Sequence, residues 1–248
     1  MHPRPPLAHV LLPAAAFYTI AILASGALAS IQPATHIPGE VLQLVQLGPA
    51  IAVAILALLW RRRITPALAG TIGGRARPIA VLLTGPAIIA AASAAYALIR
   101  SRSGFEAPEH PFALIAVAQF AGACAEEIGW RGLLQPLLRA RFGLLTSSVT
   151  VGVMWAAWHV QVFAQDPLYA ASFVLAAVSM SVVLGIALDH SGHRLLLAGT
   201  FHTLINLGML LFMDEETGAV TPMALFAASC LTAAIAYTLK ARASIPRT

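Results

Sequence analysis

Two adjacent glutamates and an arginine stand in the otherwise apolar stretch CAEEIGWRGLL, which begins at residue 124. Glu127 and Arg131 are four residues apart, so on a helix they share a face and can form an ion pair. Glu126 points about 100° away around the same helix and needs a different partner. A carboxylate held beside a reacting group can serve as a general base. The stretch therefore indicates acid–base chemistry, with a purely structural ion pair for Glu127 and Arg131 as the alternative.

Two later segments add polar side chains at the same helical spacing. MWAAWHVQVF places Trp155 four residues before His159, and GTFHTLINLG places His202 four residues before Asn206, so each pair shares a helical face. Polar residues within apolar helices often only bond neighbouring helices. The coincidence of two carboxylates, an arginine, two histidines and an asparagine favours a functional site, because ionisable groups inside a membrane usually serve function.

The composition decides which elements must position these residues. Of the 248 residues 59% are hydrophobic and only 10% are charged, and the mean hydropathy is +0.81. Long Ala, Leu, Ile and Val runs, without strand-like alternation, predict an all-α membrane bundle rather than a β-barrel. The sequence pI near 9.9 reflects basic residues between the apolar runs, as membrane topology requires, and no nucleic-acid partner is expected.

Eight apolar runs are long enough to cross a bilayer of about 30 Å, which predicts a polytopic bundle of about eight transmembrane helices. We expect one transmembrane domain over residues 1–248, with the three motifs inside 111–213. Gly129, Gly132 and Pro136 could end the fourth run early and leave a short interfacial helix. RRRITPALAGTIGGRAR is expected to be a loop without a folded domain. The runs lie near residues 7–31, 41–60, 79–99, 111–138, 145–165, 168–188, 194–213 and 219–239.

The charges around the runs predict the orientation. With both termini in the cytosol, twelve of the fifteen basic residues are cytosolic, Arg131 is in the bilayer, and Arg100 and Arg102 are outside. We expect the motif residues to lie about 10–22 Å from the cytosolic surface, at 1.5 Å per residue, in a cavity open to the cytosol. The small residues ALA at 27–29 leave a cleaved signal peptide as an alternative for the first run, although its length favours a span. Seven acids fall outside: Glu40, Glu106, Glu109, Asp166, Asp214, Glu215 and Glu216.

The three motifs resemble those of the CAAX prenyl protease and bacteriocin-processing (CPBP, or Abi) family of intramembrane endopeptidases. EEIGWR matches the Glu-Glu-x-x-x-Arg signature, Trp155 and His159 resemble the second motif, and His202 with Asn206 resembles His-x-x-x-Asn. One departure is Trp155, where the family usually has Phe. The resemblance implies eight spans and peptide-bond hydrolysis.

Within that resemblance, we expect Glu126 to be the general base and His159 to hold the same water. His202 and Asn206 are suited to donate hydrogen bonds to the oxyanion. Glu127 and Arg131 would fix their helix and tune its electrostatics. The family is commonly described as metalloprotease, and Glu126, His159 and His202 are the residues that would bind zinc. The chain has no His-Glu-x-x-His motif, and we favour a metal-free mechanism.

The expected substrate is a membrane-anchored or lipidated peptide or protein, cleaved at a cytosol-facing cavity, with CAAX-type C-terminal processing as one form of the reaction. Membrane lipid is the other expected partner. In a bacterial host the location would be the plasma (inner) membrane. Two other functions remain open from the residues alone: an ion- or proton-coupled transporter, and a non-catalytic membrane scaffold or immunity protein.

Overall fold

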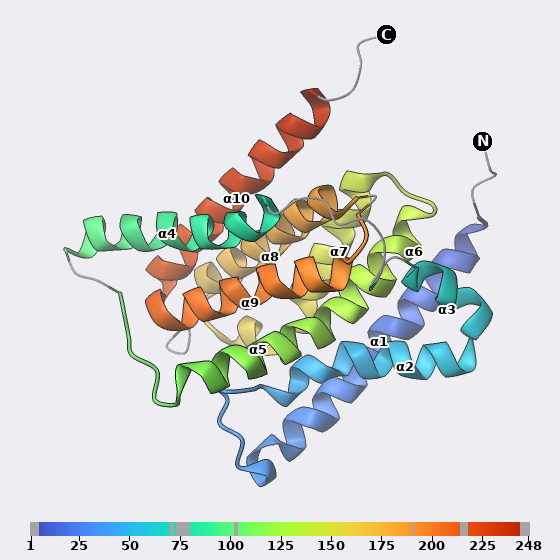
Figure 1. Cartoon of the computed structure of the whole chain (residues 1–248), viewed down its shortest axis with the longest axis horizontal. Coiled ribbons are helices and arrows are strands. Elements are labelled where there is room, and N and C mark those ends of the chain that lie inside the picture. The colour runs from blue at the N-terminus through green and yellow to red at the C-terminus, as the bar shows by residue number, and fades with distance from the viewer. Residues whose placement is uncertain are drawn as a thin grey trace.

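The computed structural model is described for residues 5–69, 72, 80–101, 104–189, 191–213 and 218–243, and these residues form helices and connecting loops without strands. Figure 1 shows the long helices running back and forth between two ends of one bundle. The helices are α1 (Leu7–Thr35), η1 (Leu44–Leu47), α2 (Gly48–Leu59), α3 (Arg61–Leu68), α4 (Ala80–Arg100), α5 (Phe112–Glu127), η2 (Ile128–Leu134), α6 (Gln135–Arg139), α7 (Leu144–Trp158), η3 (Val160–Ala164), α8 (Pro167–Leu188), α9 (Arg194–Phe212) and α10 (Val220–Ala243).

The membrane-spanning helices follow the predicted apolar runs. Six helices of the described chain are long and apolar enough to cross a bilayer, among them the continuous segment Phe112–Arg139. The shorter apolar helices Leu44–Leu59 and Leu144–Trp158 correspond to the second and fifth runs. The predicted polytopic helical membrane bundle is confirmed.

Two local expectations were wrong. The fourth span does not end near Gly129, because the chain passes from α5 through a π-helical turn, η2, into α6 without leaving the helix. A π-helix accommodates one extra residue per turn and keeps the backbone bonded, which a sequence pattern does not reveal. The expected loop after residue 60 begins with the short helix α3, whose Ile64 is fully buried while Arg61, Arg62 and Arg63 are exposed.

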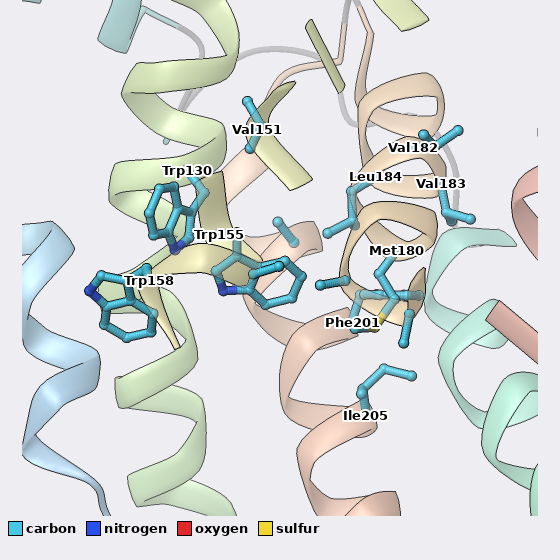
Figure 2. Close-up of a cluster of buried hydrophobic side chains, with 14 of the residues drawn as sticks. Trp130, Val151, Trp155, Trp158, Met180, Val182, Val183, Leu184, Phe201 and Ile205 are labelled. Atoms are coloured by element: carbon cyan, nitrogen blue, oxygen red, sulfur yellow. The ribbon is translucent and has the colours of Figure 1, made fainter. Parts of the chain in front are cut away.

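The buried core extends through the whole bundle, from α1, α2 and α4 through η2 and α7 to α8, α9 and α10, and the bundle surface is apolar. Leu58 and Leu98 leave 85% and 84% of their surface exposed, as side chains facing lipid do. Figure 2 shows Trp130 and Trp158 near each other on one side of the core, with Trp155 between them and Met180. The ring centroids of Trp130 and Trp158 are 6.0 Å apart. These aromatic side chains form a rigid wall beside the motif residues.

The chain reversals separate the described charges between the two ends of the bundle. The basic end carries the first residues of α3, the end of α6, the start of α9 and the end of α10. The acidic end carries the loops that precede η1, α5 and α8, together with Arg100. Eight charges of the predicted topology lie outside the described residues: Arg4, Arg75, Arg77, Arg102, Arg247, Asp214, Glu215 and Glu216.

Candidate active site

A cavity of about 850 Å³ extends into the bundle from its acidic end. Its deep walls come from α5, α7, α8 and α9, and its mouth consists of residues 38–40 and 106–110. Five of the six predicted site residues are on its lining or bonded directly to a lining side chain. The cavity is lined by Glu126, His159, His202 and Asn206, and also by Trp155.

The cavity mouth is held by contacts between its two loops. Glu40 accepts hydrogen bonds from the Glu109 backbone N–H at 2.9 Å and from the His110 ring at 2.5 Å. The hydrogen bond from His110 lowers the pKa of the Glu40 carboxyl below its ordinary value. The backbone N–H of Glu106 donates to the carbonyl of Leu211 at 2.9 Å, which fixes the second loop to α9.

The position of the mouth makes two of the expectations incompatible. The loops at the mouth are those that the charge count places outside, so a cytosolic opening and cytosolic termini exclude each other. The expected depth was counted from the basic ends of the helices, whereas the site faces the acidic end. Which of the two expectations holds depends on how the charged ends are oriented in the membrane.

Glu126 is buried, with an exposed fraction of 2%. Each of its two carboxylate oxygens accepts a hydrogen bond from a neighbouring side chain. The indole N–H of Trp155 donates to Oε2 at 2.9 Å, and the side-chain amide of Gln46 donates to Oε1 at 3.3 Å. Each carboxylate oxygen has two lone pairs, so both can still accept a hydrogen bond from a water. The separate partner that the helical geometry required is thus Trp155 together with Gln46.

Gln46 was missed by the sequence reasoning. It lies in η1, eighty residues before Glu126, and is a buried polar residue in an apolar run. That isolated polarity was the available signal. A Cβ on Gly122 would lie 2.5 Å from the Gln46 side-chain oxygen, so only glycine there lets the amide approach Glu126.

Glu127 joins two motifs through one carboxylate oxygen. Its Oε1 accepts from Arg131 Nη1 at 2.9 Å and from His202 Nδ1 at 3.0 Å, and all three side chains are buried. The ion pair at i, i+4 occurs as predicted. Because Arg131 lies in the π-helical turn, its guanidinium also stacks over the Trp155 ring at 4.8 Å from the centroid.

His159 ends α7 and turns its ring into an aromatic enclosure. Its Nδ1 lies 2.9 Å from the carbonyl oxygen of Trp155, and a carbonyl only accepts, so Nδ1 carries the proton. In the neutral ring Nε2 is therefore the acceptor nitrogen. The rings of Trp158 and Phe173 contact the imidazole edge to face at centroid distances of 4.8 and 4.9 Å. This enclosure fixes the direction of Nε2.

Asn206 lies one helical turn after His202 and is held by a residue that sequence reasoning also missed. Its side-chain amide donates to Gln119 Oε1 at 3.2 Å, and Gln119 donates to the Glu40 carbonyl at 3.3 Å. One amide hydrogen of Asn206 remains available. The motif residue is thereby linked to the cavity mouth.

The comparisons with known proteins agree with the motifs. Residues 108–208, which contain all six predicted site residues, match the Rce1-like family model, type II CAAX prenyl endopeptidase. Over this segment the chain matches the family of CAAX endopeptidases that its three motifs resemble.

The relatives with curated names are distant. CAAX prenyl protease 2 of Methanococcus maripaludis is 29% identical over 127 residues, which cover 46% of this chain and 45% of the relative. Lysostaphin resistance protein A of Staphylococcus aureus (strain MRSA252) is 26% identical over 128 residues, covering 51% of this chain and 30% of the relative. The matches span less than half the length of either relative.

The residues do not fit a metal centre as they are arranged. Among the described residues, no three His, Cys, Asp or Glu side chains are grouped to hold a metal ion. Each Glu126 oxygen keeps a lone pair beside its donor, and His159 and His202 both keep an acceptor Nε2 when Nδ1 carries the proton. It is therefore the spacing of Glu126, His159 and His202, and not a lack of lone pairs, that leaves them ungrouped as a ligand set.

Proposed function

We propose that the chain is an intramembrane endopeptidase that hydrolyses a peptide bond of a membrane-associated substrate. The observation that carries the proposal is a buried carboxylate, Glu126, facing a cavity of about 850 Å³ that also contains His159 and His202. The match of residues 108–208 to a family of CAAX endopeptidases supports the same reaction.

In the proposed reaction, a water lies between the Glu126 carboxylate and Nε2 of His159. Glu126 takes a proton from this water as the oxygen attacks the substrate carbonyl carbon. The carbonyl π bond breaks and a tetrahedral oxyanion forms. Glu126 then returns the proton to the amide nitrogen, the C–N bond breaks, and a carboxylic acid and an amine leave. Trp155 and Gln46 hold the carboxylate in place through both steps.

The oxyanion is assigned to His202 and Asn206. Asn206 has one amide hydrogen left after its bond to Gln119. His202 donates from Nε2 only when a second proton is present, and the Glu127 carboxylate on Nδ1 balances the positive charge that results. Glu127 and Arg131 are positioning residues, because they contact His202 and Trp155 rather than the reacting atoms.

We further propose that the cavity mouth faces away from the cytosol. Its described loops contain Glu40, Glu106 and Glu109, whereas the opposite end carries the arginines of α3, α6 and α9. The positive-inside rule places that arginine-rich end in the cytosol. The substrate would then be a peptide or protein anchored at the outer side of the membrane.

CAAX-type C-terminal processing is a second candidate. It is favoured by the similarity to one relative, CAAX prenyl protease 2. Prenylated C-termini are cytosolic, so this function requires the mouth to face the cytosol and the arginine-rich end to face outside. The two candidates thus differ in the orientation of the bundle.

The test is cleavage of quenched-fluorescent peptides, prenylated and unprenylated, by purified protein in detergent. We expect turnover by the parent and at least a hundredfold lower kcat in Glu126→Gln, whose amide retains an acceptor for Trp155 but is a very weak base. Glu106→Gln at the mouth is the matched control and should retain turnover. Folded parent protein without activity on any peptide would favour the scaffold or transporter functions.

A further inference from the structure

A second cavity of about 350 Å³ lies at the basic end of the bundle, opposite the mouth of the first. Its lining comes from η2, α6, the end of α8 and the start of α9. Apart from apolar residues and Gln135, the lining side chains are charged: Arg131, Arg139, Arg194 and Asp189. We refer to it as the basic cavity.

The arginine charges of the basic cavity exceed its single acid. Arg139 is bonded to Asp189, with guanidinium-to-carboxylate distances of 3.3 Å. Arg194 donates from Nη2 to the carbonyls of Ala67 and Ala69, at 3.3 and 2.7 Å, and no acidic side chain of the described chain pairs with it. Its charge is left without a counterion.

Buried polar atoms in this lining also lack hydrogen-bond partners. Arg131 is buried, with an exposed fraction of 1%. Its Nη1 donates to Glu127, whereas its Nε and Nη2 have no hydrogen-bond acceptor. Nε of Arg194 likewise has none. Gln135 donates to Ser148 at 3.1 Å, but its buried Oε1 has no donor. Native proteins seldom leave such groups unpaired, so each one needs a partner such as an ordered water or a ligand atom.

We propose that the basic cavity binds a phosphate group that also carries a hydroxyl. The phosphate oxygens would accept from the free guanidinium N–H groups of Arg131 and Arg194, and the hydroxyl would donate to Oε1 of Gln135. A planar guanidinium is well suited to phosphate oxygens. The ligand supplies the negative charge that Arg194 lacks and offers acceptors and a donor to the unpaired atoms of this lining.

Two sources offer this chemistry, the headgroup of phosphatidylglycerol and free hydrogen phosphate. A bound phosphate would also hold the Arg131 guanidinium from the side opposite Glu127, and so connect the basic cavity to the motif residues. The proposal does not depend on whether the chain hydrolyses peptides, because binding is measured without activity.

The experiment compares melting temperatures of the full chain, followed by tryptophan fluorescence, in phosphatidylcholine nanodiscs. Phosphatidylglycerol is added in one arm, and hydrogen phosphate at constant ionic strength in the other. We expect one of the two to raise the melting temperature of the parent, and the apparent affinity to fall about tenfold or more in Arg194→Gln. Arg62→Gln on exposed α3 is the control and should respond like the parent. The arm that gives the shift identifies the source.

Equal losses in Arg194→Gln and Arg62→Gln would show a general surface-charge effect and overturn the proposal, as would no shift of the parent in either arm. If Arg194→Gln does not fold, Arg194→Lys retains the charge but loses the planar fork, and should bind several-fold more weakly than the parent. Native mass spectrometry of the parent gives an independent result. Preferential retention of phosphatidylglycerol over phosphatidylcholine, or of phosphate over chloride, is expected, and no preference would contradict the site.

Discussion

Trp155 gives Glu126 a hydrogen bond that Phe, the usual residue of this CPBP motif, cannot provide. The bond from the indole N–H is 2.9 Å long and buried. We expect Trp155→Phe to lower kcat about tenfold, because a hydrogen bond to a charged group contributes about 1.5–3 kcal/mol. KM should change little if the bond positions the base rather than the substrate. Steady-state cleavage of the best fluorescent peptide measures both.

Trp158→Phe is the matched control for this prediction. Trp158 lies three residues later, and its indole N–H donates to Ser25 rather than to Glu126, at 3.1 Å. Trp158→Phe therefore removes the same indole N–H at a position that is not bonded to the Glu126 carboxylate. Equal losses of kcat in the two variants would mean that Trp155 acts by packing alone.

Glu126 and Glu127 are adjacent, but the structure assigns them different surroundings. Glu127 compensates the buried charge of Arg131, whereas Glu126 accepts only from neutral donors. We expect Glu127→Gln to reduce stability by about 3 kcal/mol or more, because it leaves an arginine buried without a counterion. Glu126→Gln should melt close to the parent. Comparable melting temperatures for both variants would mean that Glu127 does not stabilise the fold as the counterion of Arg131.

The sequence predicted those contacts of the site that depend on helical spacing. Glu127 and Arg131 form their pair within a single helical segment, and the four-residue spacing suffices to foresee it. Gln46 lies in η1 and Gln119 in α5, and their contacts with Glu126 and Asn206 depend on how η1 and α9 pack against α5. No periodicity within one segment specifies a contact across eighty residues. The close approach of Gly122 to Gln46 is equally invisible before the helices are placed.

At the scale of elements, the apolar runs predicted the spans because bilayer thickness fixes the required length of a helix. The π-helical turn η2 was not predicted, and it is the turn that places Arg131 between Glu127 and the Trp155 ring. Its sequence, IGWRGLL, contains two glycines that read equally well as the end of a helix. Phe17 and Pro49 pack so closely against Gly129 that a Cβ at this position would lie within 3 Å of both. This close packing keeps the segment in place.

The contact between the two mouth loops gives a pH-dependent contribution to stability. Since the pKa of Glu40 is lowered in the folded state by His110, folding favours the ionised carboxylate. The contribution is complete above the ordinary value of 4.5 and is lost as pH falls through the lowered pKa. We expect Glu40→Gln to melt below the parent at neutral pH, by about 1 kcal/mol or less for so exposed a contact.

The measurement is the difference in melting temperature between parent and Glu40→Gln as a function of pH. Groups that do not contact Glu40 titrate alike in both proteins and cancel. The difference should be largest above pH 4.5 and should shrink toward zero in stronger acid. A difference that stays constant with pH would mean that the ionised Glu40 carboxylate does not stabilise the mouth.

At the scale of the whole molecule, the bundle has one cavity at each end and a different charge at each. The cavity with the motif residues opens among Glu40, Glu106 and Glu109, and the basic cavity lies among arginines. Arg131, on the lining of the basic cavity, reaches the first site through Glu127 and Trp155. Because each end is defined by its own charges, a single orientation in the membrane determines which compartment each cavity meets.

The orientation is tested by labelling single cysteines in intact bacterial cells with a membrane-impermeant maleimide. The two native cysteines, Cys124 and Cys230, are first replaced by serine. Gly39→Cys is at the mouth, where no atom lies within 4 Å of a Cβ, and Arg62→Cys is at the exposed basic end. The positive-inside rule predicts labelling of Gly39→Cys alone, with Arg62→Cys labelled only after the cells are opened.

The opposite pattern has an equally definite meaning. Labelling of Arg62→Cys alone in intact cells would place the cavity mouth in the cytosol, despite the arginines at the other end. Substrates would then reach Glu126 from the cytosolic side, and CAAX-type processing of lipidated C-termini would become the better proposal. The basic cavity would face outside, where the phosphate group would come from a lipid of the outer leaflet or from hydrogen phosphate in the outer compartment. One pair of cysteines therefore decides between two substrate classes that the geometry of the site alone treats equally.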